Sequence, residues 1–129
     1  MDDPLIAQFR AKRGETGRKY PVILVTTVGR KSGKPLVTPL NFSIDGDRLV
    51  VIASAGGSET HPAWYLNLVA NPEVTIEYGH EIFRALATSA AEPERTRQFD
   101  QQAAVMSFFA AYRRSVKARE IPVVVFERI

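Results

Sequence analysis

The sequence predicts an α+β fold, a small and mostly antiparallel barrel of six strands with one helix after the third strand and helices before the last. Short β-branched runs, separated by Gly, Pro and Asp turns, indicate the strands. Only one helix-sized connection separates the third and fourth strands, and a regular alternation of strand and helix is absent. A doubly wound parallel sheet is therefore not expected. The length fits a single domain over residues 1–129.

The first part of the chain, residues 1–17, is predicted to form an N-terminal helix and arm. Apolar residues recur at helical spacing within residues 5–13, basic residues fill the other face, and two glycines end the helix. Residues 21–28 are β-branched and apolar on both faces, which is typical of a buried strand.

The second and third strands are predicted at residues 36–43 and 48–55, and the turn at residues 45–47 joins them. Pro39 lies inside the second strand, which indicates a sheet edge or a bulge there. Because the turns between these first three strands are short, we expect an antiparallel meander.

The helix after the third strand is predicted over residues 61–70. Thr60 or His61 is expected to cap it, and Trp64 and Leu68, one turn apart, are expected to face the core. The remaining predicted elements are strands at 73–78 and 82–88, one or two helices within 92–116, and a last buried strand at 121–127.

Composition excludes several classes of protein. The chain has no cysteine, which excludes a disulfide framework, a thiol nucleophile and cysteine-ligated metal centres. Hydrophobic residues make up 45% and charged residues 24%, as in an ordinary globular protein. No apolar run approaches the ~20 residues of a membrane span, and the N-terminus has no signal-peptide pattern. We therefore expect a cytoplasmic domain.

Charge is unevenly distributed along the chain. Residues 1–34 carry eight Lys and Arg against three Asp and Glu, residues 35–94 carry two against eight, and residues 95–129 carry seven against three. Basic ends around an acidic middle suggest an anionic ligand near the ends. A nucleic acid, an anionic membrane or a plain solvated surface fits the same pattern. The acidic middle and the lack of an exposed aromatic stripe argue against nucleic acid.

Two segments carry the candidate chemistry. The turn at residues 29–34, GRKSGK, offers three cations, a hydroxyl and two glycines, which suit an anion, although its spacing is not that of a nucleotide P-loop. The segment at residues 56–67 leads from a glycine pair into a helix N-terminus and adds Trp64 and Tyr65. Taken singly, the first segment could be a solvated turn, and the aromatic residues of the second could be ordinary core residues. Together they suit a flat aromatic cofactor with a phosphate tail.

Motifs for metal binding and nucleophilic catalysis are missing. His61 and His80 lie 19 residues apart with no ligand spacing around them, so no metal site is predicted. We interpret His61 as a helix cap and His80 as a solvated turn residue. A nucleophile elbow is also absent. Redox chemistry in this chain would therefore belong to a cofactor.

Four blocks of sequence resemble the deazaflavin-dependent nitroreductase family, split-β-barrel proteins related to flavin-binding split barrels. The blocks are LVTTVGRKSGKPLVTPL, DGDRLVVIASAGG, HPAWYLNLVANPEV and REIPVVVFER, and the resemblance runs from about residue 5 to residue 128. It implies one split-barrel domain that binds coenzyme F-420, an 8-hydroxy-5-deazaflavin. It also implies an oxidoreductase that passes a hydride from the reduced coenzyme to a quinone, enone or nitroaromatic.

The resemblance further implies site residues. Arg30, Lys31 and Ser32 match the family's contacts to the cofactor phosphate and tail. Ser54 and Tyr112 match the acceptor region and are the implied catalytic proton donors. The other implied cofactor contacts are Leu36, Val37, Thr38, Pro39, Leu40, Asn41, Ile52, Ala53, Ser54, Ala55, Ala63, Trp64, Tyr65, Leu66, Asn67 and Phe109.

Departures from the family pattern bear on the activity. Ala55 stands where the family often has lysine, and the lost charge is expected to weaken cofactor binding by about 1–3 kcal/mol. Asn41 and Phe109 stand where nitro-reducing members carry tyrosine, so activation of bulky nitroimidazoles is not expected. The segment around Lys117 is one residue longer, which reshapes the pocket mouth.

Two other functions remain open at this point. A non-catalytic carrier of coenzyme F-420 fits the lost lysine and tyrosines, and an FMN-dependent reductase fits the same class of barrel. The expected partners are a small-molecule hydride acceptor and no nucleic acid. We also predict weak peripheral membrane contact through the basic N-terminal helix. The predicted oligomeric state is either a monomer or a homodimer.

Overall fold

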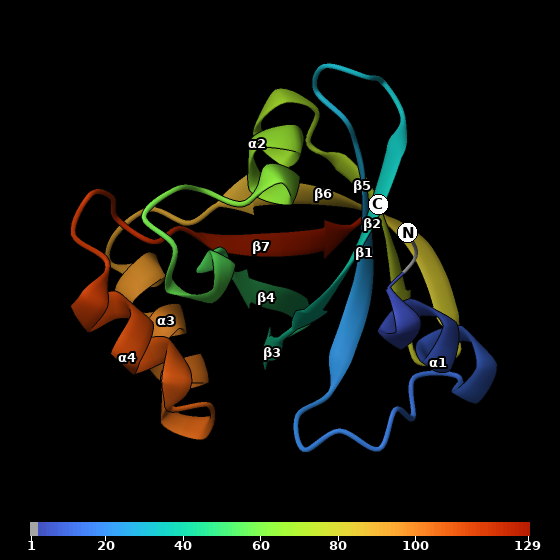
Figure 1. Cartoon of the computed structure of the whole chain (residues 1–129), viewed down its shortest axis with the longest axis horizontal. Helices are drawn as coiled ribbons and strands as arrows, with labels where there is room; N and C mark the ends of the chain where they lie inside the picture. The colour runs from blue at the N-terminus through green and yellow to red at the C-terminus, as the bar shows by residue number, and fades with distance from the viewer. Residues whose placement is uncertain (1–2) are drawn as a thin grey trace.

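The computed structural model describes residues 3–129, so Met1 and Asp2 of the predicted arm lie outside it. Within this range one seven-stranded sheet is flanked by four α-helices and a short 3-10 helix (Figure 1). The strands are β1 (Val22–Val28), β2 (Pro35–Asn41), β3 (Ser43–Asp45), β4 (Arg48–Ile52), β5 (Glu73–Tyr78), β6 (Glu81–Ser89) and β7 (Val123–Arg128). The helices are α1 (Pro4–Lys12), α2 (Ala63–Ala70), α3 (Glu94–Val105), α4 (Phe108–Ser115) and the 3-10 helix η1 (Ala55–Gly57).

The strands follow the order β2-β1-β5-β6-β7-β4-β3, and every neighbouring pair is antiparallel. The sheet curls so far that β2 comes into contact with β4, although these two strands are not neighbours in the hydrogen-bonded order. The result is a barrel with an open seam between β2 and β4, which confirms the predicted split-barrel class.

The predicted meander of the first three strands is wrong. β1 and β2 pair as a hairpin, but β4 lies across the sheet between β7 and β3. The predicted strand at 36–43 is also divided into β2 and β3, which makes seven described strands in place of six. Phe42 causes the division, because its side chain turns into the core and packs edge-on against Tyr78, with 5.3 Å between the ring centroids. This corner carries the chain from one end of the sheet to the other.

Pro39 occupies the position that its chemistry allows. It pairs with Leu24 of β1, and β2 is the end strand of the sheet. A proline there removes no ladder hydrogen bond on the outer side. The edge position predicted from Pro39 is confirmed.

The start of α2 differs from the sequence prediction, whereas the region at 92–116 agrees with the one or two helices predicted there. α2 begins at Ala63 after Pro62, without a side-chain cap, so the predicted caps at Thr60 and His61 are wrong. Thr60 instead bonds through its hydroxyl to the hydroxyl of Ser58, at 3.1 Å. The helical region predicted at 92–116 forms two helices, α3 and α4, which are separated where the backbone leaves the helical conformation after Val105.

Three apolar clusters support the sheet. The barrel interior contains Trp64 and Leu68 of α2, as predicted. A second cluster centres on Phe99 and fills the space between the sheet and the α3–α4 pair. In the third, Leu5 and Phe9 of α1 cover β1, so the N-terminal helix docks on the barrel (Figure 1). Among residues 3–129, none of the helices has both the length and the apolar character needed to cross a bilayer.

Candidate functional site

A pocket of about 220 Å³ opens at the seam between β2 and β4. We call it the seam pocket. Strand β2 supplies one wall, β4 and η1 supply another, and α2 and α4 close the ends. Nine residues predicted for the site line it: Pro39, Leu40, Asn41, Ile52, Ser54, Ala55, Trp64, Phe109 and Tyr112. The sequence reasoning missed two lining residues, Gly56 and Phe108.

The two predicted catalytic hydroxyls meet in this pocket. Ser54 follows β4 and is only 6% exposed, whereas Tyr112 comes from α4 and is partly exposed. Neither hydroxyl has a hydrogen-bond partner among the residues that the structure describes. Ile52, Trp64 and Phe109 supply apolar walls around them. The pocket therefore combines apolar side chains with polar surface, including two hydroxyls that have no partner among the described residues.

A glycine allows Tyr112 to pack over η1. Gly57 has a φ of 86°, and a Cβ at this position would lie 2.9 Å from Cδ1 of Tyr112. Both the backbone conformation and the close ring therefore require glycine. Ala55 also has a positive φ, 50°, so the loop after Ser54 is tightly bent.

Arg119 holds this loop from the other side. Its guanidinium donates hydrogen bonds to the backbone oxygens of Ala53 at 3.0 Å, Ser54 at 2.8 Å and Ser58 at 3.0 and 3.2 Å. Its Nη1 also lies 3.1 Å from Nδ1 of His61. Burial lowers the pKa of Arg119, and the nearby Glu59 acts in the opposite direction. Arg119 therefore fixes the backbone of the loop at Ala53, Ser54 and Ser58.

A second set of contacts strengthens this link. The Glu59 carboxylate accepts hydrogen bonds from the backbone N–H groups of Lys117 and Ala118, each at 2.8 Å, and these two bonds lower the pKa of Glu59. Burial, and then the charge of Arg119, lowers the pKa of His61. His61 thus belongs to the loop that Arg119 holds, and it does not cap helix α2. The sequence reasoning missed Arg119. This residue lies in the REIPVVVFER block, but nothing in that block indicates what it would contact.

The predicted tail-binding turn connects β1 to β2. It closes on itself through hydrogen bonds from Gly29 N to Lys34 O, at 2.8 Å, and from Lys34 N to the hydroxyl oxygen of Ser32, at 3.1 Å. Arg30, Lys31, Ser32 and Lys34 are all exposed. The turn therefore presents three cations to solvent.

Asn67 connects the turn to the seam pocket. It is 4% exposed, donates through Nδ2 to the Thr27 hydroxyl at 3.1 Å, and accepts from the Arg30 backbone N–H at 3.1 Å. Both ends of its amide are therefore engaged within the protein. Trp64 lies one helical turn earlier on α2 and lines the pocket. Helix α2 thus places the pocket and the turn in a fixed relation.

Several predicted cofactor contacts lie outside the seam pocket. Val37 packs beside the α1 cluster, and Ala53 is fully buried in the barrel interior. The hydroxyl of Tyr65 lies 3.0 Å from the hydroxyl of Ser89. The other predicted residues that do not line the pocket are Leu36, Thr38, Ala63 and Leu66.

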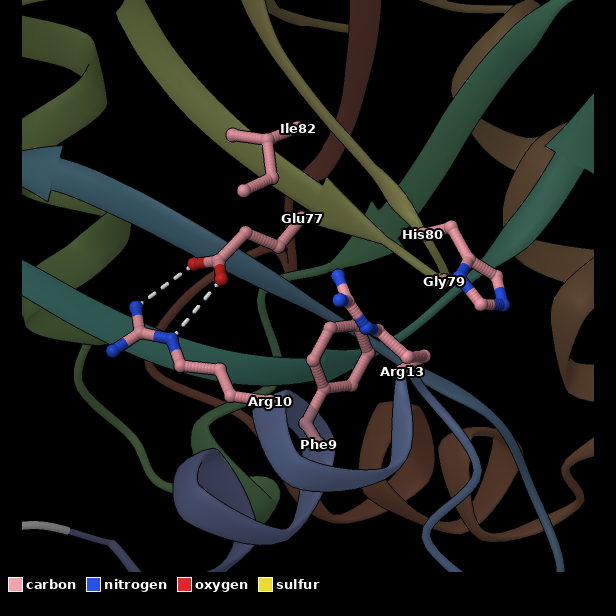
Figure 2. A pocket seen from close by; sticks show the side chains of 7 residues that line it. All are labelled: Phe9, Arg10, Arg13, Glu77, Gly79, His80 and Ile82. Atoms are coloured by element: carbon pink, nitrogen blue, oxygen red, sulfur yellow. Dashed lines mark hydrogen bonds and ion pairs between the residues drawn. The ribbon is translucent and has the colours of Figure 1, made fainter.

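A second cavity, of about 330 Å³, lies under α1 (Figure 2). Figure 2 shows the Arg10 guanidinium turned toward the Glu77 carboxylate, which accepts its two hydrogen bonds at 3.0 and 2.9 Å. None of the predicted site residues lines this cavity. No hydroxyl lines this cavity, and its one carboxylate is paired with Arg10, so the seam pocket, where Ser54 and Tyr112 meet, is the better candidate for the reaction. Within residues 3–129, no three His, Asp or Glu side chains gather as metal ligands do.

Comparison with known proteins gives a consistent family. A family model described as F420H(2)-dependent quinone reductase matches residues 4–128. An F420H(2)-dependent quinone reductase of Mycobacterium tuberculosis (strain ATCC 25618 / H37Rv) is 38% identical over 85 residues, which cover 63% of this chain. These residues span 57% of the relative, a little over half of its length.

Solved structures resemble the chain over more of its length. A structure described as an F420-H2 dependent reductase, FDR-A, has a TM-score of 0.75 and 32% sequence identity, and the match covers 82% of this chain and 93% of that one. Another, described as a domain-swapped dimer, has a TM-score of 0.78 and 29% identity, with 95% and 94% covered.

Proposed function

The chain belongs to the F420H(2)-dependent quinone reductase family, and we propose that it reduces a quinone-like acceptor with reduced coenzyme F-420. One observation carries the proposal. The seam pocket joins apolar walls to the free hydroxyls of Ser54 and Tyr112, and α2 links it to a basic turn. The whole of residues 1–129 acts in this proposal as a single cofactor-binding domain.

The residues present fit a deazaflavin. Its flat ring needs apolar walls, and Ile52, Trp64 and Phe109 provide them. Its phosphate and tail need cations and donors, which Arg30, Lys31 and Ser32 supply at the exposed turn. Asn67 supports this contact by holding the Arg30 backbone, without offering its own amide.

The protein's part in the reaction is to orient, to exclude water and to stabilise charge. When bound, the reduced coenzyme supplies a hydride from C5 of its ring. The apolar walls around Trp64 and Phe109 hold ring and acceptor together and keep water out. The hydroxyls of Ser54 and Tyr112 donate hydrogen bonds to the acceptor oxygen on which negative charge develops. Solvent then supplies the proton that completes the hydroquinone.

The test is the oxidation of the reduced coenzyme by menadione, a small naphthoquinone. We expect turnover by the wild-type protein and a loss of about tenfold in kcat when either donor is removed, in Ser54→Ala or Tyr112→Phe. Ser107→Ala is the matched control, because Ser107 is exposed and its side chain makes no cap hydrogen bond. Binding of the coenzyme without any turnover would favour the carrier function instead.

The oligomeric state and the location of the enzyme are part of the same proposal. A homodimer is supported by the structural relative described as a domain-swapped dimer, and sedimentation of the purified protein tests it. A cytoplasmic location stays a prediction. Membrane contact through α1 has no support, because its apolar residues Leu5 and Phe9 are buried against the barrel.

A further inference from the structure

The cavity under α1 has no part in the proposed reaction, and we call it the α1 cavity (Figure 2). Its lining comes from the C-terminal end of α1 (Phe9, Arg10 and Arg13) and from the β5–β6 hairpin (Glu77, Gly79, His80 and Ile82). Its volume, about 330 Å³, lies within the roughly 300–1,000 Å³ of pockets that hold small molecules. The α1 cavity therefore has room for a small ligand.

One positive charge in this cavity is left without a counter-charge. Arg10 donates two hydrogen bonds to the Glu77 carboxylate, at 3.0 and 2.9 Å, so these two charges neutralise each other. Neither the Arg13 guanidinium nor the His80 ring has a hydrogen-bond or ion-pair partner among residues 3–129. Figure 2 shows the Arg13 guanidinium pointing into the space between the Glu77 and His80 side chains. The free charge of Arg13 and the donor of His80 are therefore available to an anion.

The backbone holds Arg13 beside the hairpin turn. Arg13 follows α1 as its C-cap with a φ of 55°, a left-handed conformation that is usually taken by glycine. The next residue, Gly14, packs so closely that a Cβ there would lie 3.0 Å from Cα of Gly79. The end of α1 and the turn at Gly79 are thus in direct contact. The relative position of the Arg13 and His80 backbones is set before a ligand arrives, which lowers the cost of binding.

Apolar side chains lie beside these polar groups. Phe9, which is only 2% exposed, forms the floor of the α1 cavity, and Ile82, which is 70% exposed, stands at its rim. A ligand that reaches Arg13 therefore also covers apolar surface. This arrangement favours an anion with an apolar body over a small inorganic ion.

The charges favour a carboxylate over a phosphate. The planar fork of a guanidinium matches the two oxygens of a carboxylate. Arg13 is the one arginine of the lining without an internal partner among the described residues, so it compensates one negative charge. A second negative charge on the ligand would lie near the Glu77 carboxylate and be repelled by it.

We propose that the α1 cavity binds a small aromatic monocarboxylate, with the carboxylate on Arg13 and His80 and the ring on the apolar side chains. Such a ligand bridges the end of α1 and the β5–β6 hairpin, so its binding stabilises the docked helix. The α1 cavity and the seam pocket share no lining residue, and this site does not depend on the proposed function.

The binding test is an NMR titration of the full chain with 2-naphthoate. We expect the backbone amide signals of Arg13, Gly79 and His80 to shift to saturation, with a Kd below about 1 mM. The neutral 2-naphthamide and the doubly charged 2-naphthyl phosphate should each bind about tenfold more weakly. Shifts confined to seam-pocket residues, equal binding of the amide, or tighter binding of the phosphate would overturn the proposal, as would the absence of saturable binding.

Two substitutions separate the charge from the apolar surface. Arg13→Gln should raise the Kd for 2-naphthoate about tenfold, and Ile82→Ala should raise it about threefold. Both side chains are exposed, so both variants should fold. Arg114→Gln is the matched control, because Arg114 is an exposed arginine in the last turn of α4 that does not line the α1 cavity. An unchanged Kd in Arg13→Gln, or an equal rise in Arg114→Gln, would overturn the proposal.

Discussion

The two ends of the candidate site are built in different ways. At the seam pocket, β4, η1 and α4 meet, and Arg119 ties the loop after Ser54 through four hydrogen bonds to backbone oxygens. At the basic turn, one hairpin loop stands in solvent and is anchored to the rest of the protein by Asn67. Tertiary contacts hold the first end, whereas hydrogen bonds within the turn hold most of the second.

This difference indicates how each end would recognise its part of the coenzyme. A rigid apolar pocket discriminates by shape, because a ring of the wrong outline leaves gaps or clashes. An exposed cationic turn attracts by charge, and salt screens that attraction. The following substitutions weaken one end at a time, and we expect their effects to decrease in the order given.

Loss of Arg119 should have the largest effect. Arg119→Met removes hydrogen bonds from a charged donor to Ala53, Ser54 and Ser58, so we expect the free energy of unfolding to fall by about 3 kcal/mol. Coenzyme affinity should fall as well, because the pocket wall loosens. Urea unfolding and a binding titration measure both. The control is Arg113→Met, an exposed arginine paired with Asp100. Equal losses in the two variants would show that Arg119 does not hold the loop.

Asn67 is expected to come second. Asn67→Leu keeps the branched shape but leaves the Thr27 hydroxyl, which is fully buried, without its donor, and it releases the Arg30 backbone. We expect a loss of about 2 kcal/mol in unfolding free energy and weaker coenzyme binding. Asn71→Ala, at the exposed end of α2, is the control and should be close to neutral. Normal coenzyme affinity in the destabilised Asn67→Leu protein would argue against a link between the turn and the ligand.

The lysines of the turn should affect binding alone. Both Lys31 and Lys34 are exposed, so the double substitution to Gln should leave stability within about 0.5 kcal/mol of wild type. We expect coenzyme Kd to rise about fivefold in dilute buffer, with the difference shrinking as salt is added. Lys12→Gln, on α1, serves as the control in the same titration. A salt-independent loss would contradict recognition by charge.

The smallest expected effect is a pH dependence at the seam-pocket end. Burial, followed by the charge of Arg119, lowers the pKa of His61, so the unfolded chain takes up this proton first as pH falls. The stability that neutral His61 provides is present above about pH 6.5 and declines below it. Urea unfolding between about pH 7.5 and 5.5 measures the decline, and His61→Asn should flatten it. An unchanged profile in that variant would assign the titration to another group.

The sequence predicts those features that depend on local pattern. The alternation of residues 73–78, the edge position of Pro39 and the core-facing Trp64 and Leu68 are all confirmed. The position of β4 in the sheet is not predictable in this way. β4 pairs with β3 across the short turn, as the turn predicts, but the break between β2 and β3 places this hairpin at the opposite end of the sheet from β2. The buried Phe42 corner redirects the chain, and its effect depends on Tyr78, a residue distant in sequence.

The same limit applies to the candidate site. The resemblance supplies nine of the residues that line the seam pocket. It does not supply Arg119, whose partners Ala53 and Ser58 lie more than 60 residues away and are contacted through backbone oxygens that no side chain signals. The resemblance names Asn67 as a cofactor contact, and this stays a prediction, because in the structure its amide bonds Thr27 and the Arg30 backbone within the protein.

The most direct test is a fluorescence titration of the purified protein with oxidised coenzyme F-420, run beside FMN. We expect micromolar or tighter binding of coenzyme F-420, no binding of FMN, and weaker coenzyme binding in both Arg119→Met and the Lys31/Lys34 double variant. Binding of FMN in preference to coenzyme F-420 would contradict a deazaflavin site and favour a flavin reductase. Binding of neither cofactor would contradict the assignment of the seam pocket as a deazaflavin site.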